Sequence, residues 1–363
     1  MSTDSTKKHF YWLNWLRFLA ALSVMFVHVR GLAFVDFGSL PDQQKTVFMM
    51  GFYGLTRIGL ESVIVFFVIS GFLVLGMAIE RIQKKTFNFG DYLLDRAVRI
   101  LLPLIPALVL SGLIAYVLDI DIYLSVFMGN IFGLQNVFFS SFGGNAPLWS
   151  LAYETWFYML IGIAGLMVVK ANHKVVYLIL FTMVLSVFVQ LNPIYLFCWG
   201  IGGIAYLVKP KEYSPRVLIL AVVLILFSAV GSQYTSESKS VSVVTFNSFI
   251  FTQDFMLLYL AMGMALFIQQ LVVMKPQKAW LVALEAYGSK LSAFSYTLYL
   301  VHYPIVLLIF KKWIPNASTV NFISILTFVG VSAICLGVSV LFYLMFEKHT
   351  YGVKKKIKIM FYT

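Results

Sequence analysis

Long apolar runs separated by short polar segments dominate this chain. A membrane-spanning α-helix needs roughly 20 mostly apolar residues, and ten stretches of this kind can be marked along the sequence. They cover residues 10–29, 58–79, 99–118, 148–169, 174–190, 193–208, 216–232, 248–273, 292–310 and 322–346. The pattern predicts an all-α integral membrane protein, a bundle of about ten transmembrane helices.

One further apolar segment, residues 122–139, does not fit the pattern of a span. It is short and aromatic, and Gly129, Asn130 and Gly133 interrupt it. Irregular backbone at membrane depth has to be surrounded by protein. We therefore predict an interfacial or re-entrant segment here rather than another crossing.

The Lys and Arg residues are divided unevenly between the two sides of the predicted bundle. With the N-terminus in the cytoplasm, 20 of the 27 fall in cytoplasmic segments, Arg17 lies within a span, and six lie on the opposite side. Those six are Arg30, Lys45, Arg57, Lys239, Lys311 and Lys312. Because cytoplasmic loops carry an excess of Lys and Arg, we predict that both termini are cytoplasmic. A basic cytoplasmic tail is expected from about residue 347.

Composition narrows the class of protein further. Of the 363 residues, 61% are hydrophobic and only 12% are charged, too few charges to cover a soluble domain of this length. We expect one transmembrane domain over residues 1–363, with the first apolar run as a permanent span. The net charge of +12 is spread in clusters between apolar runs, which argues against nucleic acid as a partner. Cys198 and Cys335 lie in apolar stretches with no zinc-site spacing, so we predict packing roles for them and no metal.

Two ionisable residues in the first span are predicted to share a face. Arg17 and His28 are eleven residues apart, which brings them within about 20° of each other around a helix and about 16.5 Å apart along it. Arg17 could instead reach the interface with a long side chain, and His28 could form a helix–helix hydrogen bond. Their common face favours a polar cavity that both of them line.

Other ionisable residues also fall within or at the ends of spans, where they are costly and tend to be functional. Arg96 and Arg99, at the cytoplasmic end of the third span, form a two-pronged cationic site suited to phosphate, although ordinary interface anchoring also explains them. Glu154 in the fourth span needs a partner, for which His28 and His302 are candidates at a similar depth. A histidine poised by a carboxylate can act as a general base.

Glu61 begins the second span, one helical turn after Arg57. Residues at this spacing are neighbours on a helix surface. A surface ion pair with Arg57 is the simplest interpretation of Glu61.

Four blocks of residues occur along the chain in the same order as in a known family. They are Asn14-Trp15-Leu16-Arg17-Phe18-Leu19-Ala20-Ala21-Leu22 with His28; Phe66-Phe67-Val68-Ile69-Ser70-Gly71-Phe72-Leu73 followed by Arg96-x-x-Arg99; Pro147-Leu148-Trp149-Ser150-Leu151-x-x-Glu154; and Ser295-Tyr296-x-Leu298-Tyr299-x-x-His302-x-Pro304. Together they resemble membrane-bound acyltransferase family 3 across nearly the whole chain.

The resemblance implies a ten-span domain that uses acetyl-CoA, or another acyl-CoA, to O-acylate glycans or lipid-linked sugars such as lipopolysaccharide, capsule or exopolysaccharide. The Arg-x10-His pair of the family corresponds to Arg17 and His28, and its Arg-x-x-Arg pair corresponds to Arg96 and Arg99. The family's acid after Trp-Ser-Leu corresponds to Glu154.

The chain departs from the family pattern at three places. Many members have an acid where Thr155 stands, an acid where Ile64 stands, and an arginine where Asp95 stands. These differences leave acyl transfer as the expected reaction but weaken any inference about the substrate.

The residues and the resemblance together give a predicted site. The catalytic candidates are His28, Glu154 and His302; the acyl-CoA-binding candidates are Arg17, Arg96 and Arg99; and the acceptor or structural motif contains Trp149, Ser150, Ser70 and Tyr299. In this scheme acyl-CoA binds from the cytoplasm, its arm follows the Arg17–His28 face, and His28 deprotonates the acceptor hydroxyl while Glu154 orients the imidazole.

We expect no bound cofactor, with acyl-CoA as donor substrate, a glycan or lipid-linked saccharide as acceptor, membrane lipid as surroundings, and a bacterial inner membrane as location. The alternative function is a secondary transporter or exporter of a saccharide, which would also have ten spans and buried charges. Transporters often carry two interrupted helices at matching positions, and no such pair is visible in this sequence.

Overall fold

The computed structural model describes residues 10, 12–169, 173–237, 252–314 and 316–362, and in these residues the chain is helical with no β-strand. The predictions made for Lys239 and for the start of the eighth span, residues 248–251, lie outside the described residues.

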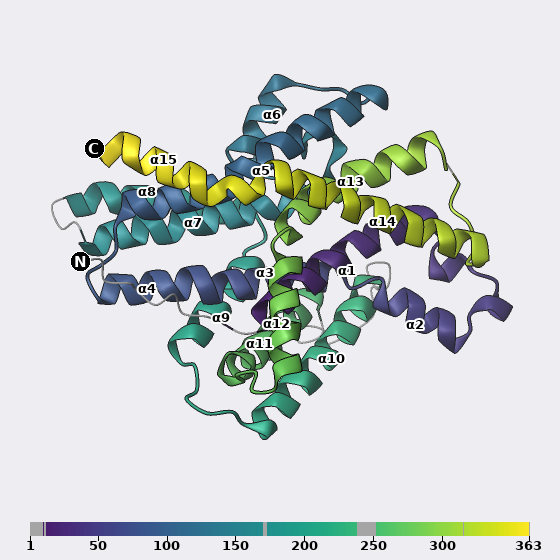
Figure 1. The fold of residues 1–363 in the computed structure, drawn as a ribbon, viewed down its shortest axis with the longest axis horizontal. Helices are drawn as coiled ribbons and strands as arrows, with labels where there is room; N and C mark the ends of the chain where they lie inside the picture. Colours follow the sequence, from purple (N-terminus) through teal and green to yellow (C-terminus); the bar gives the residue numbers. More distant parts are fainter. Residues whose placement is uncertain (1–9, 11, 170–172, 238–251, 315, 363) are drawn as a thin grey trace.

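The helices follow the apolar runs of the sequence. Their bounds are α1 (Leu13–Ala33), α2 (Val47–Leu55), α3 (Gly59–Ser70), a π-helical turn (Gly71–Leu75), α4 (Gly76–Gln83), α5 (Phe89–Val117), α6 (Leu124–Ile131), α7 (Trp149–Val169), α8 (Lys174–Gln190), α9 (Ile194–Leu207), α10 (Pro215–Glu237), α11 (Gln253–Val273), α12 (Ala279–Ser292), α13 (Ser295–Lys312), α14 (Phe322–Met345) and α15 (Thr350–Tyr362). α15 and α4 lie at one end of the molecule and α2 at the other (Figure 1).

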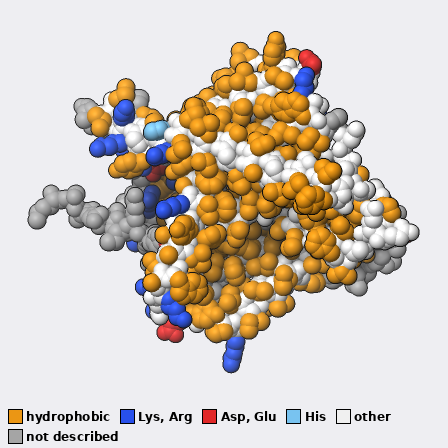
Figure 2. Space-filling view, turned by 45° about the vertical axis from the view of Figure 1, so that its right-hand side comes forward, with side chains coloured by type: hydrophobic (Ala, Val, Ile, Leu, Met, Phe, Trp, Pro, Cys, Tyr) orange, Lys and Arg blue, Asp and Glu red, His pale blue; other side chains and the backbone are white. Residues whose placement is uncertain are grey.

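The all-α membrane bundle predicted from the sequence is confirmed. Seven helical stretches are long and apolar enough to cross a membrane, or eight if the bent pair α12–α13 forms one span. Two shorter apolar helices, α8 and α9, match the remaining predicted spans, so the total of ten stays a prediction. Figure 2 shows a broad apolar surface on one face of the bundle, with most of the visible Lys and Arg side chains along its left edge.

The segment 122–139 contains only the eight-residue helix α6, too short to cross a membrane. The Asn130 side-chain amide donates hydrogen bonds to the carbonyls of Val126 (2.8 Å) and Ser140 (2.9 Å), and its oxygen accepts one from the Phe142 amide (3.1 Å). The buried Asn130 side chain thus joins α6 to the irregular chain that follows it, and the segment does not cross the membrane as a helix, in agreement with the prediction.

α5 begins at Phe89 and not at residue 99, where the third span was predicted to begin. The Asn88 side chain caps this helix by accepting a hydrogen bond from the Asp91 amide, and Asp91 lies in the first turn, where a carboxylate favours the helix dipole. Arg96 and Arg99 therefore lie inside the helix, about 10–15 Å from its start, and not at its end.

The segment before the ninth span forms α12, a helix that the sequence analysis did not predict. It is bent by 48° from α13 and packs on α1, where a Cβ on Gly288 would come within 2.4 Å of the Trp15 ring. The indole of Trp15 also donates a hydrogen bond to the Leu284 carbonyl (2.8 Å). This contact holds the start of α1 against the bend that precedes α13.

The predicted basic tail is also helical. In α15, Lys354 forms an ion pair with Asp95 and Lys358 forms one with Asp91, so the tail docks on the first turns of α5. The two lysines are four residues apart, as are the two aspartates, and this spacing aligns both pairs on facing helix surfaces.

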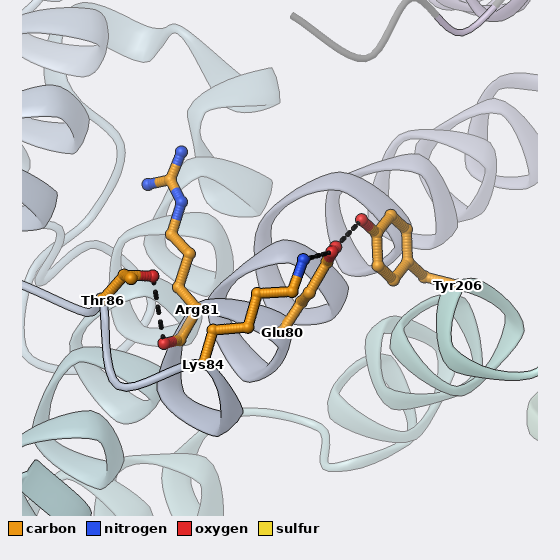
Figure 3. Close-up of polar contacts among 5 residues, drawn as sticks. All are labelled: Glu80, Arg81, Lys84, Thr86 and Tyr206. Atoms are coloured by element: carbon orange, nitrogen blue, oxygen red, sulfur yellow. Dashed lines mark hydrogen bonds and ion pairs between the residues drawn. The ribbon is translucent and has the colours of Figure 1, made fainter. Parts of the chain in front are cut away.

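A polar contact joins α4 to α9 at the α15 end of the bundle. Glu80 accepts hydrogen bonds from Lys84 (2.6 Å) and from the Tyr206 hydroxyl, while the Arg81 side chain extends away from them (Figure 3). The contact fixes the end of the helix that continues from the π-helical turn.

The π-helical turn that starts at Gly71 allows α3 and α9 to approach closely. A Cβ on Gly71 would lie 1.9 Å from the Trp199 carbonyl oxygen, and a Cβ on Gly202 would lie 2.1 Å from the Val68 carbonyl oxygen. Single π-helical turns of this kind are frequent at functional sites. Here the turn directs Ser70 and Leu73 into a cavity described below.

We expect Gly71→Ala to destabilise the protein, because the new methyl group would collide with a backbone carbonyl that cannot rotate away. Overpacking of this kind typically costs about 1–3 kcal/mol. The thermal midpoint of the detergent-solubilised protein should fall by several degrees. Gly200→Ala on α9 is the matched control, because a Cβ there meets nothing within 4 Å. Equal midpoints for the two variants would contradict this packing.

Candidate functional site

A cavity of about 200 Å³ lies between α1, α3, α5, α7 and α13. Its polar lining comes from Arg17, Ser70, Arg96, Arg99, Ser150, Glu154, Tyr158, Ser295, Tyr296 and Tyr299, and the rest of the lining is apolar. Pockets for drug-sized ligands have about 300–1,000 Å³. The cavity therefore suits a thin chain or a small group and not a whole nucleotide.

Helical spacing explains why these residues meet. Arg96 and Arg99 are three apart on α5, while Ser150, Glu154 and Tyr158 are four apart on α7. Each set therefore lies on one face of its helix. Because every set faces the same space, residues from four sequence blocks line one cavity.

The three arginines are close enough to interact electrostatically. Arg17 lies within range of both Arg96 and Arg99. The Arg96 guanidinium stands over the Tyr158 ring, 5.3 Å from its centre, in a cation–π contact. Cations gathered at this depth repel one another, so the cavity favours an anionic ligand.

Two carboxylates offset part of this charge. Glu154 accepts a hydrogen bond from the Tyr158 hydroxyl and lies within electrostatic range of Arg17 and Arg99. Glu347, which follows α14, accepts hydrogen bonds from the Thr297 hydroxyl and amide and also interacts with Arg99. The sequence analysis placed residue 347 only at the start of the basic tail, so the contribution of Glu347 here was missed.

Several polar atoms on the cavity wall are buried without a hydrogen-bond partner among the described residues. They are Ser70 Oγ, Arg96 Nε and the Tyr296 hydroxyl oxygen. Buried polar groups without a partner are rare and costly. Their concentration around one cavity indicates a polar ligand.

A pair of hydroxyls lies on the wall nearest the histidines. Ser150 Oγ and the Tyr299 hydroxyl are 2.6 Å apart, and Tyr299 donates a hydrogen bond to the Pro147 carbonyl (2.8 Å). The Tyr299 ring lines the cavity on one side, and its centre is 6.1 Å from that of the His302 ring. Tyr299 therefore lies between the arginine cavity and the histidines.

His28 and His302 come together, as their predicted depth required. Their ring centres are 5.3 Å apart, and the Tyr303 ring lies 4.8 Å from that of His28. His302 is fully buried and His28 is half-buried. α1 and α13 thus bring two histidines from opposite ends of the sequence into contact.

The position of the proton on His302 follows from its hydrogen bond. Its Nδ1 lies 2.9 Å from the Leu298 carbonyl oxygen. A carbonyl only accepts, so Nδ1 carries the proton in the neutral ring and Nε2 has a free lone pair. His302 Nε2 is buried and has no hydrogen-bond partner in the described part of the chain. This nitrogen can accept a proton.

Three sequence-based expectations need correction. Glu154 contacts neither histidine, because α7 places it at the arginine end of the cavity against Tyr158. Arg17 lines the cavity but His28 does not, so the two residues do not share this cavity as was expected. Glu61 is not a surface residue, since only 7% of it is exposed.

Of the remaining predicted residues, three line the cavity and one does not. Ser70, Ser150 and Tyr299 line the cavity, but Trp149 packs beside it, with its ring 5.4 Å from that of Tyr195. In the ranges that the structure describes, no group of three or more His, Cys, Asp or Glu side chains could hold a metal ion.

Comparison with known proteins gives a partial match. Over 135 residues, the chain is 30% identical to a Haemophilus influenzae protein described only as uncharacterized. The match takes in 33% of this chain and 55% of that protein, so it spans about half the relative's length. No solved structure matches the chain.

The model of the acyltransferase domain of family 3 matches residues 10–344, which include every predicted site residue. The chain is a multi-pass membrane protein and belongs to acyltransferase family 3.

Proposed function

We propose that this protein transfers an acyl group, most simply acetyl, from cytoplasmic acyl-CoA to a hydroxyl of a glycan or lipid-linked saccharide at a bacterial inner membrane. The single observation that carries the proposal is the position of the cavity. Three arginines surround it, and Tyr299 on its wall adjoins the His28–His302 pair.

Acyl-CoA combines a thin arm, which the cavity can hold, with phosphates of the charge that the cavity favours, and its nucleotide would lie outside the cavity. Its phosphates match guanidinium groups, which form strong charged hydrogen bonds to phosphate oxygens. Arg96 and Arg99 would bind these phosphates, and the unpartnered Arg96 Nε supports this role. The pantetheine arm is thin enough for a narrow cavity, and it would place the thioester near Ser150 and Tyr299.

The histidine pair would handle the proton. The acceptor oxygen attacks the thioester carbonyl carbon, the C–S bond breaks, and CoA leaves as thiolate. His28, which is half-buried and therefore within reach of an acceptor, takes the proton of the hydroxyl and returns it to the thiolate. His302 adjoins it with a free Nε2 lone pair. The contribution of Glu154 is to offset the arginines and not to orient an imidazole.

The donor site is tested by removing one guanidinium at a time. Arg96→Gln and Arg99→Gln should each raise the Kd for CoA about tenfold or more, because a charged hydrogen bond contributes about 1.5–3 kcal/mol and about 1.4 kcal/mol is a factor of ten. Calorimetric titration of the purified protein with CoA measures this. Arg81→Gln is the matched control, because Arg81 is exposed and does not line the cavity. Unchanged affinity in both cavity variants would refute the donor site.

The base is tested in cells that carry the gene. His28→Ala should lower the rate of O-acylation about 10²–10⁴-fold, the usual contribution of a general base, and the surface glycans should carry fewer acyl groups. CoA binding should persist. Mass spectrometry of the surface glycans measures the acyl groups. His349→Ala, which changes an exposed histidine, should leave them unchanged. Near-normal acylation by His28→Ala would show that His28 is not the base.

A further inference from the structure

A second cavity, of about 570 Å³, lies at the other end of α1. Its chemically distinctive lining residues are Arg30, Asp36, Phe37, Tyr53, Arg57 and Gln233. They come from the last turn of α1, the loop after it, the α2–α3 region and α10. In the predicted topology this cavity faces the outer side, where an acceptor glycan would be.

Arg30 is the most informative residue in this cavity. It is only 9% exposed, and its Nε has no hydrogen-bond partner among the residues described. The guanidinium stands over the Tyr53 ring, 5.4 Å from its centre, and the Tyr53 hydroxyl is fixed by a 2.7 Å hydrogen bond to the Val35 carbonyl. A buried cation on a fixed aromatic ring, with an unused donor, is suited to bind an anion.

The charged residues around Arg30 do not neutralise it fully. Arg57 also lines the cavity and lies within electrostatic range of Arg30, and Glu61 lies within range of Arg57. The acid that interacts with Arg30 is Asp36, which is exposed, so water and salt weaken its effect. The lining of the cavity thus holds two guanidinium groups and one exposed carboxylate, while the buried Glu61 carboxylate lies outside the lining and offsets Arg57. The uncompensated positive charge is therefore that of Arg30.

The aromatic residues indicate what else the ligand contains. Phe37 and Tyr53 have ring centres 5.4 Å apart and both line the cavity. Gln233 adds a side-chain amide, whose nitrogen donates a 3.4 Å hydrogen bond to the Gly54 carbonyl and whose oxygen can accept hydrogen bonds from hydroxyl groups. Aromatic faces, an amide and two guanidinium groups fit a sugar that carries an acidic group.

We propose that this cavity is an acceptor subsite for an acidic saccharide, with Arg30 and Arg57 binding its carboxylate or phosphate group. Arg30 follows His28 by two residues, which places it about 3 Å further along α1 and about 200° around it. The sugar in this cavity would therefore be a different unit of the acceptor from the one that is acylated. The proposal rests on the proposed function, because it names the acceptor class for the same reaction.

Binding without acyl-CoA tests the subsite apart from the reaction. The full chain in neutral phosphatidylcholine nanodiscs is titrated with a tetrasaccharide of alternating glucuronate and N-acetylglucosamine, and with the neutral N-acetylglucosamine tetrasaccharide. We expect the acidic tetrasaccharide to bind at least about tenfold more tightly. Arg30→Gln should abolish this preference and Arg30→Lys should restore part of it. Lys311→Gln, which removes an exposed cation at the end of α13, should leave it intact.

Competition identifies the anion. Displacement of the acidic tetrasaccharide by inorganic phosphate would show that the subsite also accepts phosphorylated sugars. Resistance to phosphate would show that it prefers carboxylates. Both results support a site for an anionic sugar. Equal affinity for the two tetrasaccharides, no effect of Arg30→Gln, or displacement by phosphatidylglycerol would overturn it. CoA binding by Arg30→Gln confirms that the variant folds. If the protein acylates its acceptor but shows no preference for the acidic tetrasaccharide, only this inference is refuted. If it binds the acidic tetrasaccharide but acylates nothing, the proposed function is refuted.

Discussion

The cost of holding cations inside a membrane protein governs the site. Arg17, Arg96 and Arg99 share one cavity, and two carboxylates, Glu154 and Glu347, lie within range to offset them. Three positive charges against two negative ones leave an excess that an anionic donor can neutralise. This imbalance, in surroundings of low dielectric constant, favours an anionic ligand, as the proposed acyl-CoA donor would be.

The helices around the cavity are arranged to maintain this charge cluster. The Gly71 turn brings α9 against α3 and directs Ser70 inward, the bend between α12 and α13 starts the stripe of Tyr296, Tyr299 and His302, and α15 packs over the start of α5. Tyr299 then separates the arginines from the histidines. In the proposed reaction the donor and the proton acceptor would therefore lie on two sides of the Tyr299 side chain, which would have to move during transfer.

The sequence predicted most of the long apolar helices and most of the polar residues that line the cavity, because apolar length and three- or four-residue spacing are local properties. Arg17, Arg96, Arg99, Ser70, Ser150 and Tyr299 all reach the cavity, and His28 meets His302. Partners across helices were less predictable. Glu154 was expected to meet a histidine from another helix, but it accepts a hydrogen bond from Tyr158, one turn along α7 itself, and lies within range of the arginines. Glu347, α12 and the ion pairs of α15 depend on contacts between distant segments, which periodicity does not reveal.

Photochemical labelling by a donor analogue is the most direct measurement of whether the thioester lies beside Tyr299. An acyl-CoA whose acyl group carries a diazirine would be irradiated with the purified protein, and the labelled peptides identified by mass spectrometry. The account predicts labels within residues 147–154 or 295–303, suppressed by excess CoA. Labels confined to the Arg30 cavity, or to α10 and α11, would contradict it.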